Sequence, residues 1–333
     1  MPLRHVRGSG AASATTKVVT TPVRSVATAV GLQIFDPENI NDPAFLPTLH
    51  GFQADLLFVC DYGKILAPHV LAATRFGGIN LHGSLLPKYR GAAPINRALL
   101  NGEPTVGVSV IHITPQLDAG PVVAMSEPLP VLPEDTAVEI ETQLARIGAE
   151  LVLSILPQFA AQLDGSGGTL TAVPQRDEFA TKAPKLKKQD GEIDWRRSAQ
   201  EIVWQYQALQ PWPKIFTWWH RKNAPESNNP EPMRLILGRV RLADANAVNE
   251  TAAGNVFKTA GGNAVIEANG VTGEGVVPGT VLEVSDAGIM VATGSGVLQI
   301  LEIQPANKKM MPAGAFLRGY PIMPEDRLSD VEV

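Results

Sequence analysis

The segment that most constrains the fold spans residues 79–120, where two apolar runs flank a loop rich in glycine, serine and proline. The first run predicts a short strand whose end carries Asn80 and His82. Because strand side chains alternate between the faces of a sheet, these two side chains point the same way. The second run, residues 106–113, is almost continuously apolar, which is typical of a buried strand in a parallel sheet. A helix is predicted between the two runs, at 94–100.

Asp118 follows the second run and completes a group of three polar side chains. If the two strands run parallel, Asn80, His82 and Asp118 meet at the carboxyl ends of the strands, where open α/β sheets bind ligands. A carboxylate beside an imidazole favours the imidazolium, which together with an amide N–H can stabilise an oxyanion. The carboxylate could also take up the proton that an attacking amine releases. These residue types suit acyl or formyl transfer to an amine, although by themselves they are more often a structural pair.

The same segment resembles a known family. Its motifs Asn80-Leu81-His82, Ser84-Leu85-Leu86-Pro87 and Asp118-Ala119-Gly120 are similar to those of the formyltransferases that use 10-formyltetrahydrofolate. The run SLLPKYRGAAPI that starts at Ser84 is most similar to the members that act on methionyl-tRNA, and the similarity extends from about Thr20 to about Leu328. The resemblance implies that Asn80, His82 and Asp118 are the catalytic residues. The loop before the acid has glutamine where the family usually has glycine.

The resemblance also implies binding residues on either side of this group. The cofactor, 10-formyltetrahydrofolate, would contact Tyr62, Ile65, Leu66, Ser84, Leu85, Leu86 and Pro87. The partner, initiator methionyl-tRNA, would contact Arg90, Lys17, Arg24, Lys308 and Lys309. From the residues alone, an ordinary strand-to-helix turn explains Tyr62 and Leu66 equally well, and a solvated surface arginine is the ordinary interpretation of Arg90.

Length and composition limit the number of domains and the kinds of site that this chain can form. The 333 residues exceed one average domain, and 44% hydrophobic residues provide for a buried core. The single cysteine, Cys60, excludes an internal disulfide and a cysteine-based zinc site, and fits a reducing cytoplasm. The net charge of -5 excludes a globally basic surface but not a local basic groove. We expect a cytoplasmic monomer that binds no metal and no membrane.

These patterns predict an α/β protein built of two domains. A Rossmann-like parallel-sheet formyltransferase domain is expected at 1–171, a linker at 172–192 and a small antiparallel β-barrel of OB type at 193–333. Within the first domain we expect strands at 32–35 and 54–60 and a helix at 136–163 that is broken near Pro157. All five tryptophans lie between 195 and 219, which favours an aromatic core at the domain junction over a base-stacking platform.

The first 35 residues contain basic but no acidic side chains. This composition suits a nucleic-acid-binding loop, an organellar transit peptide or a disordered tail, and the resemblance favours the first. Family members start with a strand, a helix and a second strand that this sequence lacks, so we expect the native chain to start upstream of Met1. Without those elements, a neighbouring strand would keep an open edge and expose apolar surface.

The implied function is transfer of a formyl group to the α-amine of methionine on initiator tRNA. Alternative acceptors within the same chemistry are a sugar-nucleotide amine, glycinamide ribonucleotide or water. A non-catalytic RNA-binding relative is an alternative of another class. The loop at 90–94 and the predicted barrel favour tRNA over glycinamide ribonucleotide.

Overall fold

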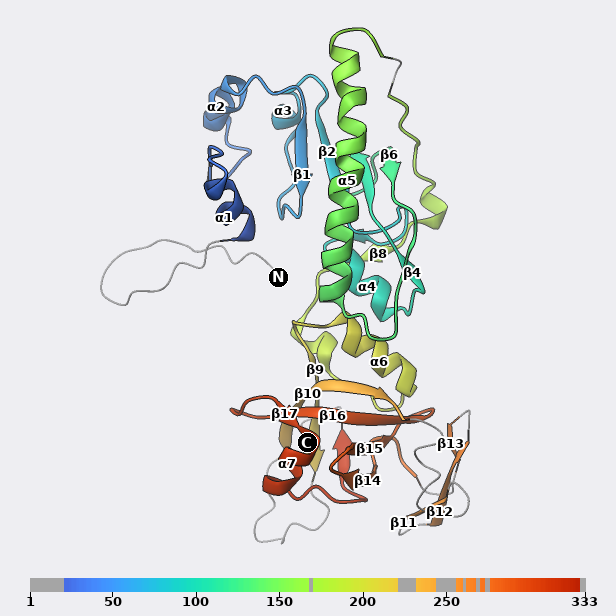
Figure 1. Cartoon of the computed structure of the whole chain (residues 1–333). Helices are drawn as coiled ribbons and strands as arrows, with labels where there is room; N and C mark the ends of the chain where they lie inside the picture. The colour runs from blue at the N-terminus through green and yellow to red at the C-terminus, as the bar shows by residue number, and fades with distance from the viewer. Residues whose placement is uncertain are drawn as a thin grey trace, which may run out of the picture.

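The computed structural model describes residues 21–167, 170–220, 232–243, 256–259, 262–267, 270–272 and 276–329. In its N-terminal part a small sheet lies beside a long helix, and in its C-terminal part an antiparallel sheet curls on itself (Figure 1). A shorter helix, α6, lies between the two parts (Figure 1).

The N-terminal part contains most of the helices. Its elements are α1 (Pro22–Ala29), η1 (Pro43–Phe45), α2 (Leu46–Gly51), β1 (Leu57–Cys60), α3 (Pro68–Leu71), β2 (Gly78–His82), β3 (Arg90–Gly91), α4 (Pro94–Leu100), β4 (Thr105–Val106), β5 (Ser109–His112), β6 (Val122–Met125), β7 (Leu129–Pro130) and α5 (Ala137–Leu163). The strand expected at 54–60 and the helix expected at 94–100 are thereby confirmed.

The central sheet has the order β1-β2-β5-β6 and is mixed. β1 runs parallel to β2 with Cys60 opposite Leu81, whereas β5 runs antiparallel to β2 with Ser109 opposite His82. The prediction of a strand at 106–113 parallel to β2 is therefore wrong, and that run is divided between β4 and β5. A continuous apolar pattern reports burial on both faces of a strand, but it carries no information on strand direction.

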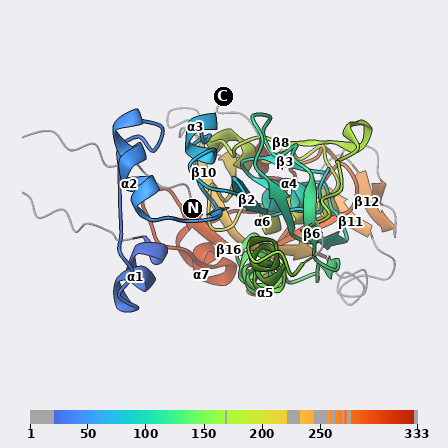
Figure 2. The same cartoon turned by 90° about the horizontal axis from the view of Figure 1, so that it is seen from above.

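Helix α5 covers one face of this sheet and is unbroken from Ala137 to Leu163. Figure 2 shows it end-on, with β6 and α4 to one side. The predicted break near Pro157 is wrong. Ile155 and Phe159, on either side of the proline, are buried in one cluster with Ile79 and Val110 of the sheet. Proline has no backbone N–H and so leaves out one helical hydrogen bond. The packing on both sides of Pro157 stabilises the helix at this point.

Among the described residues, α5 is also the one helix with the length and apolarity of a membrane span. In this structure its buried side packs against β5 and β6 of its own domain. A core helix of this kind passes the same test of length and composition, so the feature by itself is weak support for a membrane contact.

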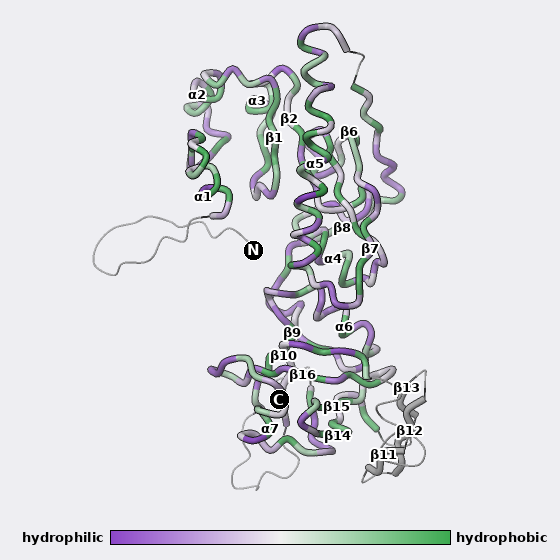
Figure 3. Tube along the Cα trace, in the orientation of Figure 1, coloured by the Kyte–Doolittle hydropathy of each residue, from purple (hydrophilic) through white to green (hydrophobic). Residues whose placement is uncertain are grey.

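The N-terminal edge of the sheet is open within the described residues. Only β2 pairs with β1, and Figure 3 shows β1 as hydrophobic along its length. Phe58 is 50% exposed, and α1 buries none of its side chains. The open edge and the exposed apolar surface that we expected are both present. The strand predicted at 32–35 does not form, because Phe35 packs edge-on against Phe45 and Phe52 rather than joining a ladder.

The remaining elements form the linker and the C-terminal part. They are η2 (Asp177–Phe179), β8 (Lys182–Ala183), η3 (Lys188–Gly191), α6 (Ala199–Ala208), β9 (Ile215–His220), β10 (Met233–Leu242), β11 (Val256–Thr259), β12 (Gly262–Glu267), β13 (Gly270–Thr272), β14 (Val281–Ser285), β15 (Gly288–Ala292), β16 (Val297–Pro305), β17 (Met311–Pro312), α7 (Ala313–Gly319) and β18 (Arg327–Ser329).

The main C-terminal sheet has the order β14-β15-β16-β10-β9-β18, and all its neighbours are antiparallel. It curls until its two edges meet. The Leu328 N–H donates to the Gly279 carbonyl at 2.8 Å, and the Val281 N–H donates to the Asp326 carbonyl at 2.9 Å. The expected antiparallel barrel is therefore present.

The tryptophans contribute to a core that is continuous across the domain junction. One buried cluster extends from Leu99 of α4 through Ile202 of α6 to Phe316 of α7. Trp195 and Trp219 are buried in it, and their indole N–H groups donate to Thr217 and Asp326. For these two tryptophans the prediction of an aromatic core is confirmed, whereas Trp212 is 42% exposed.

Closure of the C-terminal sheet predicts a strict requirement for Gly279. This residue has a φ of +91°, and an added Cβ would lie 2.1 Å from the Leu328 carbonyl oxygen. Gly279→Ala is expected to lower the free energy of unfolding by about 1–3 kcal/mol. The matched control is Gly319→Ala at the end of α7, where an added Cβ meets nothing within 4 Å. Equal denaturant midpoints for the two variants would contradict the prediction.

Candidate active site

His82 and Asp118 lie together at the rim of the sheet. The imidazole is 5% exposed, and its Nδ1 lies 3.7 Å from Oδ2 of Asp118. Its Nε2 lies 2.9 Å from the carbonyl oxygen of Tyr89. Because a carbonyl oxygen can only accept, Nε2 carries the proton in this hydrogen bond. Nδ1 is thus the nitrogen that faces the carboxylate.

Asp118 reaches His82 by a different route from the one that the sequence predicted. Since β5 is antiparallel to β2, it is the start of β5 that lies beside His82, and the loop after β5 must turn back. Asp118 adopts a φ of +50° in this loop, and its Oδ2 accepts the Gly91 N–H at 2.9 Å. Gly120 follows directly, and a Cβ there would lie 1.8 Å from the His112 carbonyl oxygen.

Asn80 lies two residues before His82 on the same face of β2 and is half-buried. Within the described part of the chain, its side-chain amide makes no hydrogen bond to protein. The amide can therefore donate to a bound molecule on the face of β2 that also carries His82. An unpaired amide N–H of this kind can donate to a developing oxyanion.

The segment after β1 lies at the same rim, since Cys60 is paired with Leu81 in the parallel ladder. Tyr62 and Ile65 are 45% and 65% exposed, whereas Leu66 is buried. The Asn41 side chain holds this segment by two hydrogen bonds: it donates to the Ile65 carbonyl at 2.9 Å and accepts the Ala67 N–H at 2.8 Å. Exposed apolar side chains on a supported loop suit a flat ligand, and the assignment of these residues to the cofactor remains a prediction.

The loop after His82 is shaped by hydrogen bonds inside the protein. Ser109 Oγ donates to the Ser84 carbonyl at 2.7 Å and accepts the Leu86 N–H at 3.0 Å. The buried Ser84 hydroxyl donates to the Lys88 carbonyl at 2.6 Å. The Leu86–Pro87 peptide bond is cis, and Leu85 covers Gly107 so closely that a Cβ there would lie 2.5 Å from it. The structure gives the loop this architecture, and its cofactor contacts remain predictions.

The residues predicted to bind tRNA differ in the exposure of their side chains and in their protein partners. Arg90 is 11% exposed, and its guanidinium donates to Gln175 and to Asp177. It is therefore not the solvated arginine that residue type suggests. Arg24 pairs with the exposed Asp36 at 2.6 Å. Lys308 and Lys309 are exposed in the β16–β17 connection, and Lys17 lies outside the described residues.

Sequence analysis missed several residues that build the site. Tyr89, with a φ of +63°, presents its carbonyl to His82, and its own N–H donates to Oγ1 of Thr181 at 2.8 Å. The Tyr89 hydroxyl donates to Glu103, and burial raises the pKa of Tyr89 to about 12. No local pattern could have identified these roles, because Thr181 and Gln175 come from the linker about 90 residues away.

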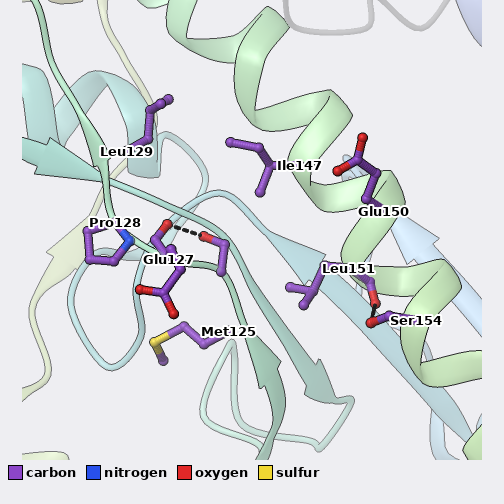
Figure 4. Close-up of a pocket in the computed structure, with 9 residues that line it drawn as sticks. Met125, Glu127, Pro128, Leu129, Ile147, Glu150, Leu151 and Ser154 are labelled. Carbon is purple, nitrogen blue, oxygen red and sulfur yellow. Dashed lines mark hydrogen bonds between the residues drawn. The ribbon is translucent and has the colours of Figure 1, made fainter.

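A separate groove of about 540 Å³ lies between α5 and the β6–β7 segment (Figure 4). Its wall includes Met125, Leu129, Ile147 and Leu151, with the carboxylates of Glu127 and Glu150 at its sides. None of the predicted site residues lines it. In the part of the chain that the structure describes, no group of three or more His, Cys, Asp or Glu side chains could hold a metal ion.

An unpaired amide and an imidazole–carboxylate pair, with no activated serine or cysteine beside them, are suited to direct transfer of an acyl group to an amine. The sequence matches a known protein family. Residues 7–156 match the description "Formyl transferase", and residues 185–321 match "Formyl transferase, C-terminal domain". The chain belongs to the formyl transferase family, and the predicted fold class is confirmed.

Individual relatives agree with this assignment. The chain is 38% identical over 301 residues to a methionyl-tRNA formyltransferase of Rhodopirellula baltica, covering 90% of this chain and 79% of the relative. It is 36% identical to the methionyl-tRNA formyltransferase of Moorella thermoacetica, covering 95% of this chain and 87% of that one. A solved structure of HypX from Aquifex aeolicus with tetrahydrofolic acid shares the fold, with a TM-score of 0.53 at 16% identity over 84% of this chain and 41% of HypX.

The two hydrogen bonds of Ser109 predict a measurable effect on stability. Ser109→Ala leaves the Ser84 carbonyl and the Leu86 N–H without partners in a buried place, which is expected to lower the free energy of unfolding by about 1–3 kcal/mol. Ser154→Ala is the control, because its hydroxyl bonds the Leu151 carbonyl on the exposed face of α5. Thermal unfolding of both variants tests this, and a Ser109→Ala variant as stable as Ser154→Ala would refute it.

Glu103 predicts a pH dependence of stability. Burial raises its pKa, but hydrogen bonds from Lys88 and Tyr89 outweigh burial, so that the pKa is lowered from the ordinary 4.5. A carboxylate with a lowered folded-state pKa stabilises the fold fully above the ordinary value and loses this contribution as the pH falls. Wild type is therefore expected to exceed Glu103→Gln in stability at pH 7, with a difference that shrinks below about pH 4.5. A constant difference in denaturant unfolding from pH 7 to pH 3 would argue against this role.

Proposed function

We propose that this protein transfers the formyl group of 10-formyltetrahydrofolate to the α-amine of methionine on initiator tRNA. The observation that carries the proposal is the placement of Asn80, His82 and Asp118 at one rim of the sheet, in a chain whose similarity to methionyl-tRNA formyltransferases covers both domains. The identity of the formyl donor, the initiator tRNA, a monomeric state and a cytoplasmic location are parts of the same proposal.

The geometry supports a direct attack of the amine on the formyl carbon. As the new C–N bond forms, negative charge develops on the formyl oxygen, which the Asn80 amide stabilises by a hydrogen bond and the protonated His82 by its positive charge. The Asp118 carboxylate stabilises the positive imidazolium beside it. The proton that the amine loses balances the proton that the departing folate nitrogen gains. His82 and Asp118 are placed to move it, directly or through water.

The folate is assigned to the rim beside this group. Tyr62, Ile65 and Leu66 on one side and the Ser84 to Pro87 loop on the other would enclose its ring system. The exposure of Tyr62 and Ile65 supports this assignment, because such apolar surface is free to cover a ring.

The tRNA is assigned to exposed lysines of the linker and of the C-terminal sheet. Lys182, Lys185, Lys187 and Lys188 are exposed on the linker, as are Lys308 and Lys309 on the C-terminal sheet. Exposed lysines can neutralise RNA phosphates even in a chain whose net charge is negative. Lys17 and Arg24 are assigned to the same partner. Arg90 is assigned a contact with the acceptor end, although its guanidinium already has two protein partners.

Single substitutions test the catalytic assignment. Asn80→Ala, His82→Ala and Asp118→Ala are each expected to lower turnover by about two to four orders of magnitude, because each removes charge stabilisation or proton transfer. His50→Ala in the exposed end of α2 is the control and should retain wild-type turnover. The assay measures formyl transfer to charged initiator tRNA beside a sugar-nucleotide amine. Transfer to the sugar amine alone would overturn the proposed substrate, and a near wild-type rate of any site variant would overturn its role.

A further inference from the structure

The linker between the two domains contributes to the site itself. We propose that Gln175, in this linker, is a positioning residue that holds Asp118 in the orientation in which its carboxylate faces His82. This inference rests on the proposed function, in which Asp118 assists proton transfer. It assigns to the linker a part in catalysis that is independent of any contact with RNA.

The Gln175 amide uses its full hydrogen-bonding capacity. Its Nε2 donates at 2.8 Å to both the Asp118 carbonyl and the Gly120 carbonyl. Its Oε1 accepts from Nε and Nη2 of Arg90 at 3.0 and 2.8 Å. A primary amide has two N–H donors and one oxygen that accepts twice, so this orientation is the one that satisfies every partner.

The Asp118 loop needs such a clamp. With a φ of +50°, Asp118 lies in the left-handed region, which residues other than glycine adopt only occasionally and as single residues. Its neighbours Gln116 and Leu117 are exposed, and within the loop the Gln116 carbonyl accepts from the Thr114 hydroxyl at 3.0 Å and from the Ala119 N–H at 3.4 Å. Gln175 bonds the carbonyls on both sides of Ala119 and thereby fixes the backbone from which the carboxylate projects.

The same linker fixes the other contact of the carboxylate. Strand β8 pairs in parallel with β3, and the Arg90 N–H donates to the Thr181 carbonyl at 2.8 Å. Gly91 lies so close to this strand that a Cβ would be 2.4 Å from the Ala183 carbonyl oxygen. The Gly91 N–H is therefore held where it donates to Oδ2 of Asp118.

Gln175 is itself firmly placed. Two residues before it, Val173 exchanges two backbone hydrogen bonds of 2.8 Å with Val122 at the start of β6. On its other side, Arg90 is held to Asp177 as well as to Gln175. The linker is thus attached to the sheet just before Gln175 and to the β3 loop just after it, so Gln175 can transmit its position to Asp118.

The decisive variant is Gln175→Glu. It keeps the shape and the oxygen that Arg90 requires, but it places a second oxygen against the two carbonyls that Nε2 now binds. We expect kcat for formyl transfer to fall about tenfold to a hundredfold, as misplacement of a reacting group does, with KM for both substrates within about twofold. We also expect faster hydrogen exchange of the Gly91 amide, which reports the contact with Asp118. Gln175→Met, which removes the donors without adding charge, serves if the charged variant does not fold.

The matched control is Asp177→Asn, which weakens the exposed ion pair of Arg90 but leaves Gln175 intact. It should retain wild-type kcat and Gly91 exchange. An unchanged kcat and unchanged Gly91 exchange in both Gln175 variants would overturn the proposal, as would a loss of kcat that only follows the fraction of unfolded protein. If the wild type transfers no formyl group, the proposed function fails, while Gly91 exchange still decides whether Gln175 positions Asp118.

Discussion

The hydrogen bond between Nε2 of His82 and the Tyr89 carbonyl is the interaction on which the site depends. It assigns the proton of one ring nitrogen and directs the other toward Asp118. To make it, Tyr89 adopts a left-handed backbone conformation, and its phenol and its N–H are both tied to other residues. The imidazole is thus held through Nε2 by residues outside the predicted catalytic group, with Nδ1 facing Asp118 and the Asn80 amide left without a protein partner among the described residues.

The segment that joins the two parts of the chain also contributes to this arrangement. The linker supplies Thr181, Gln175 and the strand that pairs with β3. Beyond it, α6 continues the same buried core into the C-terminal sheet. A partner that contacts the exposed lysines of the linker therefore contacts the same segment that orients the carboxylate.

The open edge of β1 contrasts with the end of β2, where His82 and Asp118 are held by hydrogen bonds to neighbouring loops. Residues of the site lie on β2 and on loops that are bonded from both sides, whereas α1 and the outer side of β1 expose apolar side chains. The N-terminal part is therefore unevenly packed, and the predicted catalytic residues lie in its better packed half.

The local sequence determined the elements and the chemistry. The spacing of Asn80 and His82 sets both on one face of a strand, alternating runs define the C-terminal strands, and short motifs identify the family. Tertiary structure alone decided the direction of β5, the continuity of α5 across Pro157 and the partners of Arg90. Strand direction and long-range hydrogen bonds arise from groups far apart in the chain, and neither the period of a pattern nor the type of a residue encodes which distant group it will meet. For this reason Asp118 was recognised in the sequence, while Gln175, which holds it in place, became visible only in the fold.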